Sequence, residues 1–372
     1  MARICFVNYD NYPVLNPRYG GNYIGGESVQ QVLLARALAN RGHEVSTVVA
    51  DLGQPDGEFV DGIRVWKTFA PGAGVPVLRF LHPKLTSIVS ALRRADADIY
   101  YQSCAGMVTG VTAWYARRHG RKFVFRIAHD SDCMPGQQII PYWRDRKLYE
   151  YGLKRADLVV AQTALQADLL QHNYGVSSAE INMVVAPPSG DVAERDIDVL
   201  WVNNFRAFKK PERFLDLAAA LPDVRMVMIG GPCPGEEGFF EDIRREANSL
   251  PNLQLTGFVP YHEVNAYYGR ARVFVNTSDV EGFPNSYLQA WVRGTPVVAF
   301  FDPDGLIARK GLGHKASDLN DMAAAVRRFM AEARYWQSVS AQVREYAITQ
   351  YHPDKVAAQY EVLFDRLLVS PS

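Results

Sequence analysis

The sequence predicts an α/β protein made of two doubly wound, parallel-sheet domains with a cleft between them. Short apolar runs typical of buried strands alternate with helix-period segments, which is the pattern of a parallel sheet covered by helices on both faces. This pattern starts again in the second half of the chain. The length of 372 residues is long for one hydrophobic core and comfortable for two. Loops at the carboxyl ends of such strands are where ligands are expected.

In the first half, the apolar runs and the helical stripes alternate without a break. The helix expected at 29–40, for example, places Val29, Val32, Leu33 and Ala37 on one stripe. The expected strands are 4–8, 45–49, 99–101 and 123–127, and the expected helices are 29–40, 85–94 and 108–118.

The second half repeats the alternation and ends in a helix at about 354–368. Adjacent prolines and a glycine punctuate the chain at Ala186-Pro-Pro-Ser-Gly190, which favours a domain boundary there. The predicted domains are 1–188 and 189–350, with 351–372 as a terminal helix that packs back on the first. The expected strands are 199–202, 227–229, 273–275 and 297–300, and the helices 212–221, 241–249 and 319–330.

Composition narrows the class of protein. Lys plus Arg and Asp plus Glu both number 40, so no net charge draws the chain onto nucleic acid. The four cysteines lie far apart without a C-x-x-C pair, which favours a reducing compartment over a disulfide scaffold or a zinc site. No apolar run approaches the ~18 residues of a membrane span. We therefore expect a cytoplasmic, enzyme-sized protein.

A glycine-rich stretch, Gly20 to Ser28, lies between the first strand and its helix. Glycines before a helix N-terminus let main-chain N–H groups approach a phosphate. The spacing is not G-x-G-x-x-G, so a dinucleotide site is not indicated. A flexible surface loop explains the stretch equally well. Ser28 and Gln31 have the spacing of a capping box, which predicts that the helix begins here.

The sharpest pattern runs from Glu281 to Pro296. Asn285 is a good N-cap, and Gly294 with Pro296 ends the helix before the next strand. The helix N-terminus would then face the cleft. Glu281, in the loop just ahead, would accept hydrogen bonds from sugar hydroxyls. An ordinary capped helix with a solvated glutamate is the alternative. The apolar face of this helix is formed by Tyr287, Leu288, Trp291 and Val292.

This segment resembles the E-x7-E region of the retaining GT-B glycosyltransferases of the family-four group, whose usual form is close to E-G-F-P-N…E-A…G-T-P-V-V. The likeness covers nearly the whole chain. It includes Gly25-Gly26, Arg41-Gly-His-Glu-Val45, Ala156 to Ala161, Trp201 to Pro211 and Gly257-Phe-Val259.

The resemblance implies a GT-B architecture of two Rossmann-like domains and a metal-independent, retaining hexosyltransferase without a cofactor. The donor would be a UDP- or GDP-sugar, and the acceptor a glycan or a lipid-linked molecule of the kind used in bacterial polysaccharide assembly. As catalytic residues it implies Glu281 on the donor sugar's hydroxyls, Lys209 on the diphosphate and His129 near the donor sugar and the acceptor. The implied donor-binding residues are Gly25, Gly26, Asn204, Arg206, Gly257, Phe258, Val259, Gly282, Phe283, Pro284, Asn285, Ser286 and Gln289.

Two positions depart from the family pattern. The second glutamate of the motif is Gln289, whose amide can still bind ribose hydroxyls. The arginine that usually accompanies the lysine falls on Asn204, which carries no charge. Either Arg206, two residues further, takes over, or phosphate binding depends more heavily on Lys209.

Asp130 and Asp132 form a D-x-D beside His129, a pattern that binds divalent metals in another glycosyltransferase fold. So short a motif arises easily by chance, and the resemblance favours chemistry without a metal. The segment Pro141 to Lys147 mixes aromatic and basic residues, which suits peripheral docking on the inner face of a membrane. A solvated helix face is the favoured explanation of that segment.

Two other functions share the predicted architecture. One is a sugar-nucleotide-binding subunit without turnover, which Asn204 and Gln289 suggest and which the retained His129, Lys209 and Glu281 argue against. The other is a nucleotide-sugar epimerase, which the intact E-G-F-P-N segment disfavours. An NAD-dependent dehydrogenase lacks its glycine fingerprint here.

Overall fold

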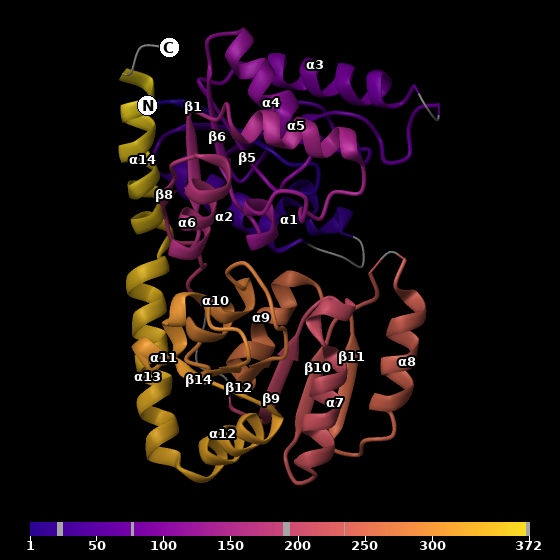
Figure 1. Cartoon of the computed structure of the whole chain (residues 1–372), viewed down its shortest axis with the longest axis vertical. Coiled ribbons are helices and arrows are strands. Elements are labelled where there is room, and N and C mark those ends of the chain that lie inside the picture. Colours follow the sequence, from indigo (N-terminus) through magenta and orange to yellow (C-terminus); the bar gives the residue numbers. More distant parts are fainter. Residues whose placement is uncertain (21–24, 76–77, 189–193, 234, 370–372) are drawn as a thin grey trace. The chain divides into compact units, whose positions relative to one another are not determined.

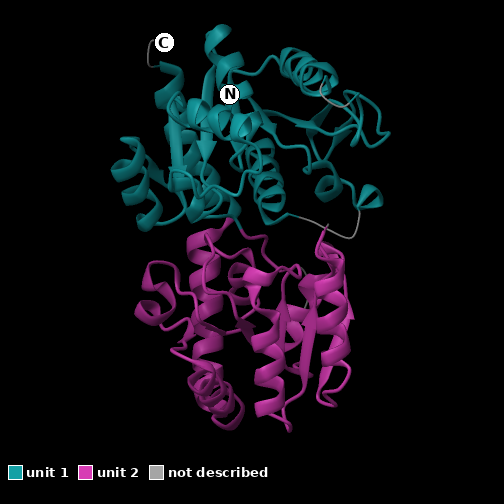
Figure 2. Ribbon diagram, turned by 45° about the vertical axis from the view of Figure 1, so that its right-hand side comes forward, with its two compact units in different colours: residues 1–20, 24–184, 353–372 teal, residues 21–23, 185–352 magenta. Residues whose placement is uncertain are grey.

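The computed structural model describes residues 1–20, 25–75, 78–188, 194–233 and 235–369. Ser189 and Gly190 of the predicted boundary, and residues 21–24 of the glycine-rich stretch, lie outside the described residues. The chain divides into two compact units, shown in different colours in Figure 2. Within the described residues, unit 1 comprises 1–20, 25–184 and 353–369, and unit 2 comprises 185–352.

The strands of unit 1 form one sheet in the order β3-β4-β2-β1-β5-β6-β7-β8. All pairings are parallel except that of β3 with β4. The strand order reverses between β1 and β5, so this pair is the topological switch point of the sheet. The strands are β1 (Arg3–Val7), β2 (Glu44–Val49), β3 (Phe59–Val60), β4 (Ile63–Lys67), β5 (Ile99–Ser103), β6 (Lys122–Arg126), β7 (Leu158–Ala161) and β8 (Ala179–Glu180).

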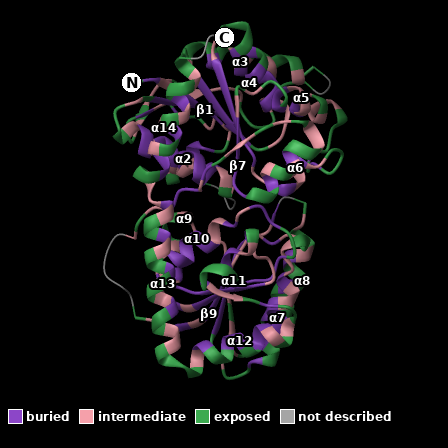
Figure 3. Cartoon of the chain, turned by 60° about the vertical axis from the view of Figure 1, so that its left-hand side comes forward, coloured by how far each residue is buried: buried purple, intermediate pink, exposed green. Residues whose placement is uncertain are grey.

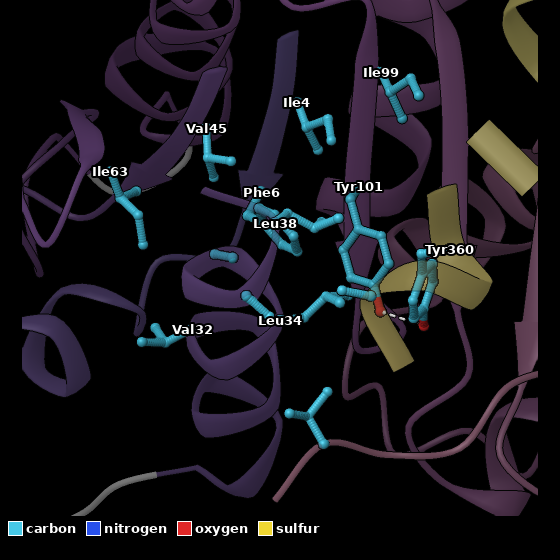
Figure 4. Close-up of a cluster of buried hydrophobic side chains, with 14 of the residues drawn as sticks. Ile4, Phe6, Val32, Leu34, Leu38, Val45, Ile63, Ile99, Tyr101 and Tyr360 are labelled. Atoms are coloured by element: carbon cyan, nitrogen blue, oxygen red, sulfur yellow. Dashed lines mark hydrogen bonds between the residues drawn. The ribbon is translucent and has the colours of Figure 1, made fainter. Parts of the chain in front are cut away.

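Helices cover both faces of this sheet because successive strand residues point to opposite sides. Ile4 and Phe6 pack with α2 and α14, whereas Cys5 and Val7 pack with α3, α4 and α5. Figure 4 shows the first of these clusters, in which the hydroxyls of Tyr101 and Tyr360 lie 3.2 Å apart. The helices of unit 1 are α1 (Tyr12–Leu15), α2 (Gly26–Asn40), α3 (Thr86–Ala95), α4 (Met107–Arg118), α5 (Trp143–Leu153), α6 (Ala164–Tyr174) and α14 (Pro353–Val369).

The sheet of unit 2 is entirely parallel and has the order β11-β10-β9-β12-β13-β14. Its order reverses between β9 and β12, which is the second switch point. The strands are β9 (Ile197–Val202), β10 (Met226–Ile229), β11 (Leu253–Gly257), β12 (Ala271–Asn276), β13 (Val297–Ala299) and β14 (Gly313–Lys315).

Aromatic rings fill the core around α10 in unit 2. Trp291 packs against Tyr287 at 5.7 Å and against Tyr346 of α13 at 6.4 Å between ring centroids. Strands and inward helix faces are buried, and exposed residues lie on the outward faces of the helices (Figure 3). The helices, labelled in Figure 1, are α7 (Pro211–Ala220), α8 (Glu237–Ala247), α9 (Tyr261–Arg270), α10 (Asn285–Trp291), α11 (Leu306–Lys310), α12 (Leu319–Ala331) and α13 (Ala333–Tyr351).

The predicted capping box at Ser28 is wrong. Helix α2 begins earlier, with Gly25 as N-cap and no side-chain capping bond. The Ser28 hydroxyl accepts from Asn8 Nδ2 at 3.1 Å, and Gln31 Oε1 accepts from Asn11 Nδ2 at 3.2 Å. Both side chains therefore tie the helix to the loop after β1, and the glycines alone form its N-terminus.

Among the described residues, no helix combines the length and the apolar character needed to cross a membrane.

Helices α4 and α5 approach each other closely through two glycines. A Cβ added at Gly110 would lie 2.4 Å from the carbonyl oxygen of Leu148. One added at Gly152 would lie 2.6 Å from the carbonyl of Thr109. Any larger side chain at either position must therefore separate the two helices.

We expect Gly110→Ala to lower the free energy of unfolding by about 1–3 kcal/mol, because the added methyl collides with the backbone of α5. Urea denaturation checks this. Gly238→Ala on α8 is the control, since its Cβ would meet nothing within 4 Å. There the free energy should stay unchanged or rise by up to about 1 kcal/mol. Equal effects of the two changes would contradict the steric explanation.

Candidate functional site

Two loops meet at the switch point of unit 2. Lys209 follows β9 in the short 3-10 turn Ala207–Lys209, and Glu281 follows β12. The Lys209 ammonium lies 2.6 Å from Glu281 Oε1 and 2.5 Å from Oε2. The pair is largely buried, with side chains 16% and 8% exposed. Two residues 72 positions apart thus form the charged centre of this edge of the sheet.

Hydrogen bonds from the strands fix the Lys209 turn. The Thr277 hydroxyl donates to the main-chain oxygen of Lys209 at 2.9 Å, and Trp201 Nε1 donates to the Thr277 oxygen at 2.9 Å. Trp201 lies on β9 and Thr277 follows β12, and both are fully buried. The main chain at Lys209 is therefore held by residues of the two strands that define the switch point and of the loop after β12, and Glu281 holds its ammonium.

Helix α10 begins just after Glu281, as the sequence predicts, but its N-cap is Pro284 and not Asn285. Asn285 is the first helical residue, and no side chain caps the helix. The prediction of Asn285 as N-cap is wrong because Pro284, whose ψ of 121° is extended, is the last residue before the helical conformation begins. Gly282, Phe283 and Ser286 occupy this loop and the first turn of α10.

Asn204 and Arg206 lie in the loop after β9, both half-buried. Arg206 Nε donates to the Cys233 sulfur at 3.2 Å, and its guanidinium lies 6.0 Å from the centre of the Phe208 ring. The Lys209 ammonium lies 5.0 Å from the same ring. Phe208 therefore stands beside both cations of this loop.

Gln289 is buried on α10 and has a partner that the sequence did not suggest. Its Nε2 donates to Asn265 Oδ1 at 3.1 Å, and Asn265 Nδ2 donates to the main-chain oxygen of Tyr261 at 3.1 Å. These two bonds orient the Gln289 amide so that Oε1 points away from Asn265. Asn265 lies on α9, directly after the predicted Gly257, Phe258 and Val259, and Gly257 has a φ of +78°.

Gly25, Gly26 and His129 belong to unit 1. The glycines form the N-terminus of α2, and Glu27 in its first turn contacts Arg126 Nη1 at 3.0 and 3.3 Å. Burial raises the pKa of Glu27, and Arg126 opposes this shift. Since arginine stays protonated, it neutralises a carboxylate that would otherwise repel an anion at this helix N-terminus. The sequence pattern pointed neither to Glu27 nor to this role of Arg126.

His129 caps the turn that follows β6. Its Nδ1 accepts the Ser131 main-chain N–H at 3.1 Å, so the neutral ring carries its hydrogen on Nε2. Asp132 completes the turn, because its Oδ2 accepts the N–H groups of Ala128 and His129 at 3.3 and 3.1 Å. Burial raises the Asp132 pKa to about 7, against the lowering effect of these two bonds.

The D-x-D carboxylates have structural partners. Asp132 holds the His129 turn, and Asp130 Oδ1 accepts from Gln166 Nε2 at 2.9 Å. Over the described ranges, no three His, Cys, Asp or Glu side chains are grouped so that they could hold a metal ion. That the reaction needs no metal remains a prediction.

Comparisons with known proteins cover both units. Residues 25–189 match the family described as "Glycosyl transferase 4-like domain". Residues 196–332 match the family described as "Glycosyl transferases group 1". Together the two matches span most of the chain.

A curated relative is D-inositol 3-phosphate glycosyltransferase of Nocardiopsis dassonvillei, 25% identical over 94% of this chain and 91% of its own length. Among solved structures, sucrose-phosphate synthase from Thermosynechococcus elongatus superposes with a TM-score of 0.79 at 18% identity, covering 99% of each chain. Anabaena HepE in complex with UDP and glucose superposes with a TM-score of 0.74 at 14% identity, covering 98% of this chain and 100% of its own.

We expect Asp132 to make stability depend on pH. Because its folded-state pKa of about 7 lies above the ordinary 3.8, protonation favours the folded state. Stability should fall as pH rises from about 5 to 8, by on the order of 2–3 kcal/mol from this group. Asp132→Asn keeps an acceptor oxygen but cannot ionise, so urea denaturation at both pH values should show a smaller fall.

Asp216→Asn, an exposed carboxyl on α7, is the control and should leave the pH dependence of the parent chain unchanged. An unaltered pH dependence in Asp132→Asn would show that this carboxyl does not titrate between pH 5 and 8.

Proposed function

Since this chain belongs to the glycosyltransferases of the GT-B fold and family-four type, we propose that its donor is a UDP- or GDP-sugar. We further propose that it is a retaining hexosyltransferase, that it acts without a metal and that it transfers the sugar to a glycan or lipid-linked acceptor. The family and the fold expected from the sequence are confirmed by the comparisons, and so is an enzyme that transfers sugar. The donor, the stereochemistry and the acceptor are the proposed parts.

The observation that carries the proposal is the Lys209–Glu281 pair at the switch point, directly ahead of α10. A buried carboxylate held by one cation can accept hydrogen bonds from sugar hydroxyls. The same cation can attract the adjoining diphosphate. Such a pair binds both halves of a nucleotide sugar at once, and HepE, a protein of similar fold, was solved with UDP and glucose.

Charge balance gives Arg206 a part in this proposal. Lys209 is already neutralised by Glu281, so the pair contributes little net charge to a diphosphate. The Arg206 guanidinium lies 6.0 Å from the same phenyl ring as the Lys209 ammonium, so it is a second cation of this loop. The main-chain N–H groups at the start of α10 add the favourable end of the helix dipole. We therefore propose that Arg206 replaces the family arginine missing at Asn204.

The proposed reaction proceeds with retention. The acceptor hydroxyl oxygen attacks the anomeric carbon on the face from which the nucleoside diphosphate leaves. The glycosidic C–O bond to phosphate breaks, and a phosphate oxygen takes the proton of the acceptor hydroxyl. Lys209 and Arg206 stabilise the negative charge on the leaving group. His129, with its hydrogen on Nε2, is proposed to bind the sugar or the acceptor.

A lipid-linked acceptor would place the protein at a bilayer. A cytoplasmic location with peripheral association at the inner face of the membrane is therefore part of the proposal.

We expect the purified chain to hydrolyse one nucleotide sugar slowly in a panel of UDP-, GDP-, ADP- and dTDP-sugars, with the same rate in EDTA. Glu281→Ala and Lys209→Ala should each reduce nucleotide release by about 100-fold or more. Lys209→Ala removes the charge that stabilises the leaving group, and Glu281→Ala removes the carboxylate proposed to hold the sugar. Arg206→Ala should also reduce it. Quantifying released nucleotide checks all three.

Asp279→Ala is the matched control, because this carboxyl lies in the same loop as Glu281 but pairs with Arg213 at the surface. It should keep the parent rate. Binding of a donor without hydrolysis, even with glycan acceptors present, would favour the binding subunit. Isomerisation of the donor sugar would favour the epimerase, and no binding at all would overturn the site.

We expect Asn265→Ala to weaken binding of the nucleoside diphosphate by about 3- to 10-fold, because the Gln289 amide loses the bond that orients it. Binding of the 2′,3′-dideoxy nucleotide should not change, since it has no ribose hydroxyls for Gln289. Isothermal titration of the two nucleotides checks this. His262→Ala, an exposed change in the same helix, should alter neither affinity, and equal losses for both nucleotides would contradict a ribose contact.

A further inference from the structure

Two segments of unit 1 expose large apolar side chains to solvent. One is the loop and first turn of α5, with Tyr142 and Trp143, and the other lies before α3, with Leu78 and Leu81. These four side chains are 56% to 78% exposed. Single exposed apolar residues are ordinary, but several together indicate a binding surface.

A direct contact joins the two segments. The Arg144 guanidinium lies 3.7 Å from the centre of the Phe80 ring. Phe80 stands between Arg79 and Leu81, and Arg144 follows Trp143. The two groups of exposed side chains therefore border one stacked pair. We call the set Leu78, Arg79, Leu81, Lys84, Tyr142 and Trp143 the aromatic–basic surface.

Described residues before α3 hold one another by close contacts. The Arg79 N–H donates to the Val75 main-chain oxygen at 2.8 Å. A Cβ on Gly74 would lie 2.5 Å from Pro83 and 2.8 Å from the Arg79 side chain, so the glycine lets these residues close on one another. Leu78 and Leu81, which flank this contact, are exposed.

The segment that carries Leu78 and Leu81 is rich in positive charge. Residues 62–95 contain six Lys or Arg and no Asp or Glu, in a chain with 40 of each class. Arg79 and Lys84 form no ion pair with any described residue, whereas the α5 carboxylates Asp145 and Glu150 are each paired with a neighbouring base. Of these six bases, Lys67 and Arg94 pair with Asp51 and Asp56. Arg79 and Lys84 are thus the bases of this surface that no described carboxylate neutralises.

We propose that the aromatic–basic surface binds anionic lipid bilayers. Tyr and Trp favour the interface between headgroups and acyl chains, and leucines beside them can enter the acyl boundary. Arg79 and Lys84 attract the lipid phosphates, each contributing about 1 kcal/mol near an anionic surface. The inference extends the proposed peripheral association, but it depends on this surface alone.

Vesicle co-sedimentation of the full chain tests the inference without donor or acceptor. The parent chain should sediment with vesicles of phosphatidylcholine containing about one third phosphatidylglycerol, bind pure phosphatidylcholine at least about 10-fold more weakly, and dissociate as salt is raised. Leu81→Ser with Trp143→Ser, and separately Arg79→Glu with Lys84→Glu, should each weaken binding by about 10-fold or more.

Two controls separate the surface from general effects. Val362→Ser changes an exposed valine on α14, and Arg245→Glu reverses an exposed charge on α8. Both should keep the affinity of the parent chain, and circular dichroism should show that all variants are folded. Donor hydrolysis is measured separately, so a failure here leaves the proposed transfer reaction standing.

Three outcomes would overturn the proposal: no binding to anionic vesicles, equal binding to both lipid compositions, or equal losses in variants and controls. Self-association of the parent chain that disappears in Leu81→Ser/Trp143→Ser, without vesicle binding, would instead identify an interface between copies.

Discussion

The direction of the strands constrains everything that this protein can place in a site. In a parallel sheet the carboxyl ends of all strands lie at one edge. Where the strand order reverses, the loops after the two neighbouring strands run in opposite directions and leave a crevice between them. Between β9 and β12 that reversal brings Lys209 and Glu281 into contact although they lie 72 positions apart in sequence. Unit 1 follows the same rule, with the loop after β1 leading into the glycine N-terminus of α2.

Each unit contains a buried ion pair at the carboxyl edge of its sheet. Glu27 is held by Arg126 and Glu281 by Lys209, and removing either partner would leave an uncompensated buried charge. Each pair also stands beside the N-terminus of a helix. The main-chain N–H groups at these helix N-termini therefore add to the attraction that the cation of each pair exerts on an anionic ligand.

The sequence predicted what depends on local pattern. Buried strands such as β9 and β12 read as apolar runs, the E-G-F-P-N segment indicated α10, and the family and fold were confirmed by the comparisons. Two helix caps were misplaced. The Ser28 hydroxyl accepts a hydrogen bond from Asn8 and does not cap α2, and the N-cap of α10 is Pro284, one residue before Asn285. Asn265 was missed because its partner Gln289 lies 24 residues away in sequence. The exposed Leu78 and Leu81 were missed because no helical or strand periodicity distinguishes them from buried leucines. The roles of the site residues remain predictions.

Unit 1 is assembled from two distant parts of the chain, since α14 completes one face of a sheet whose strands all precede residue 185. During synthesis, Ile4, Phe6 and Tyr101 emerge long before Tyr360 and Phe364 can cover them. The part of that face that α14 covers must stay exposed, or be shielded by a chaperone, while all of unit 2 is translated. A premature stop within unit 2 would thus harm the domain already made as well as the one interrupted.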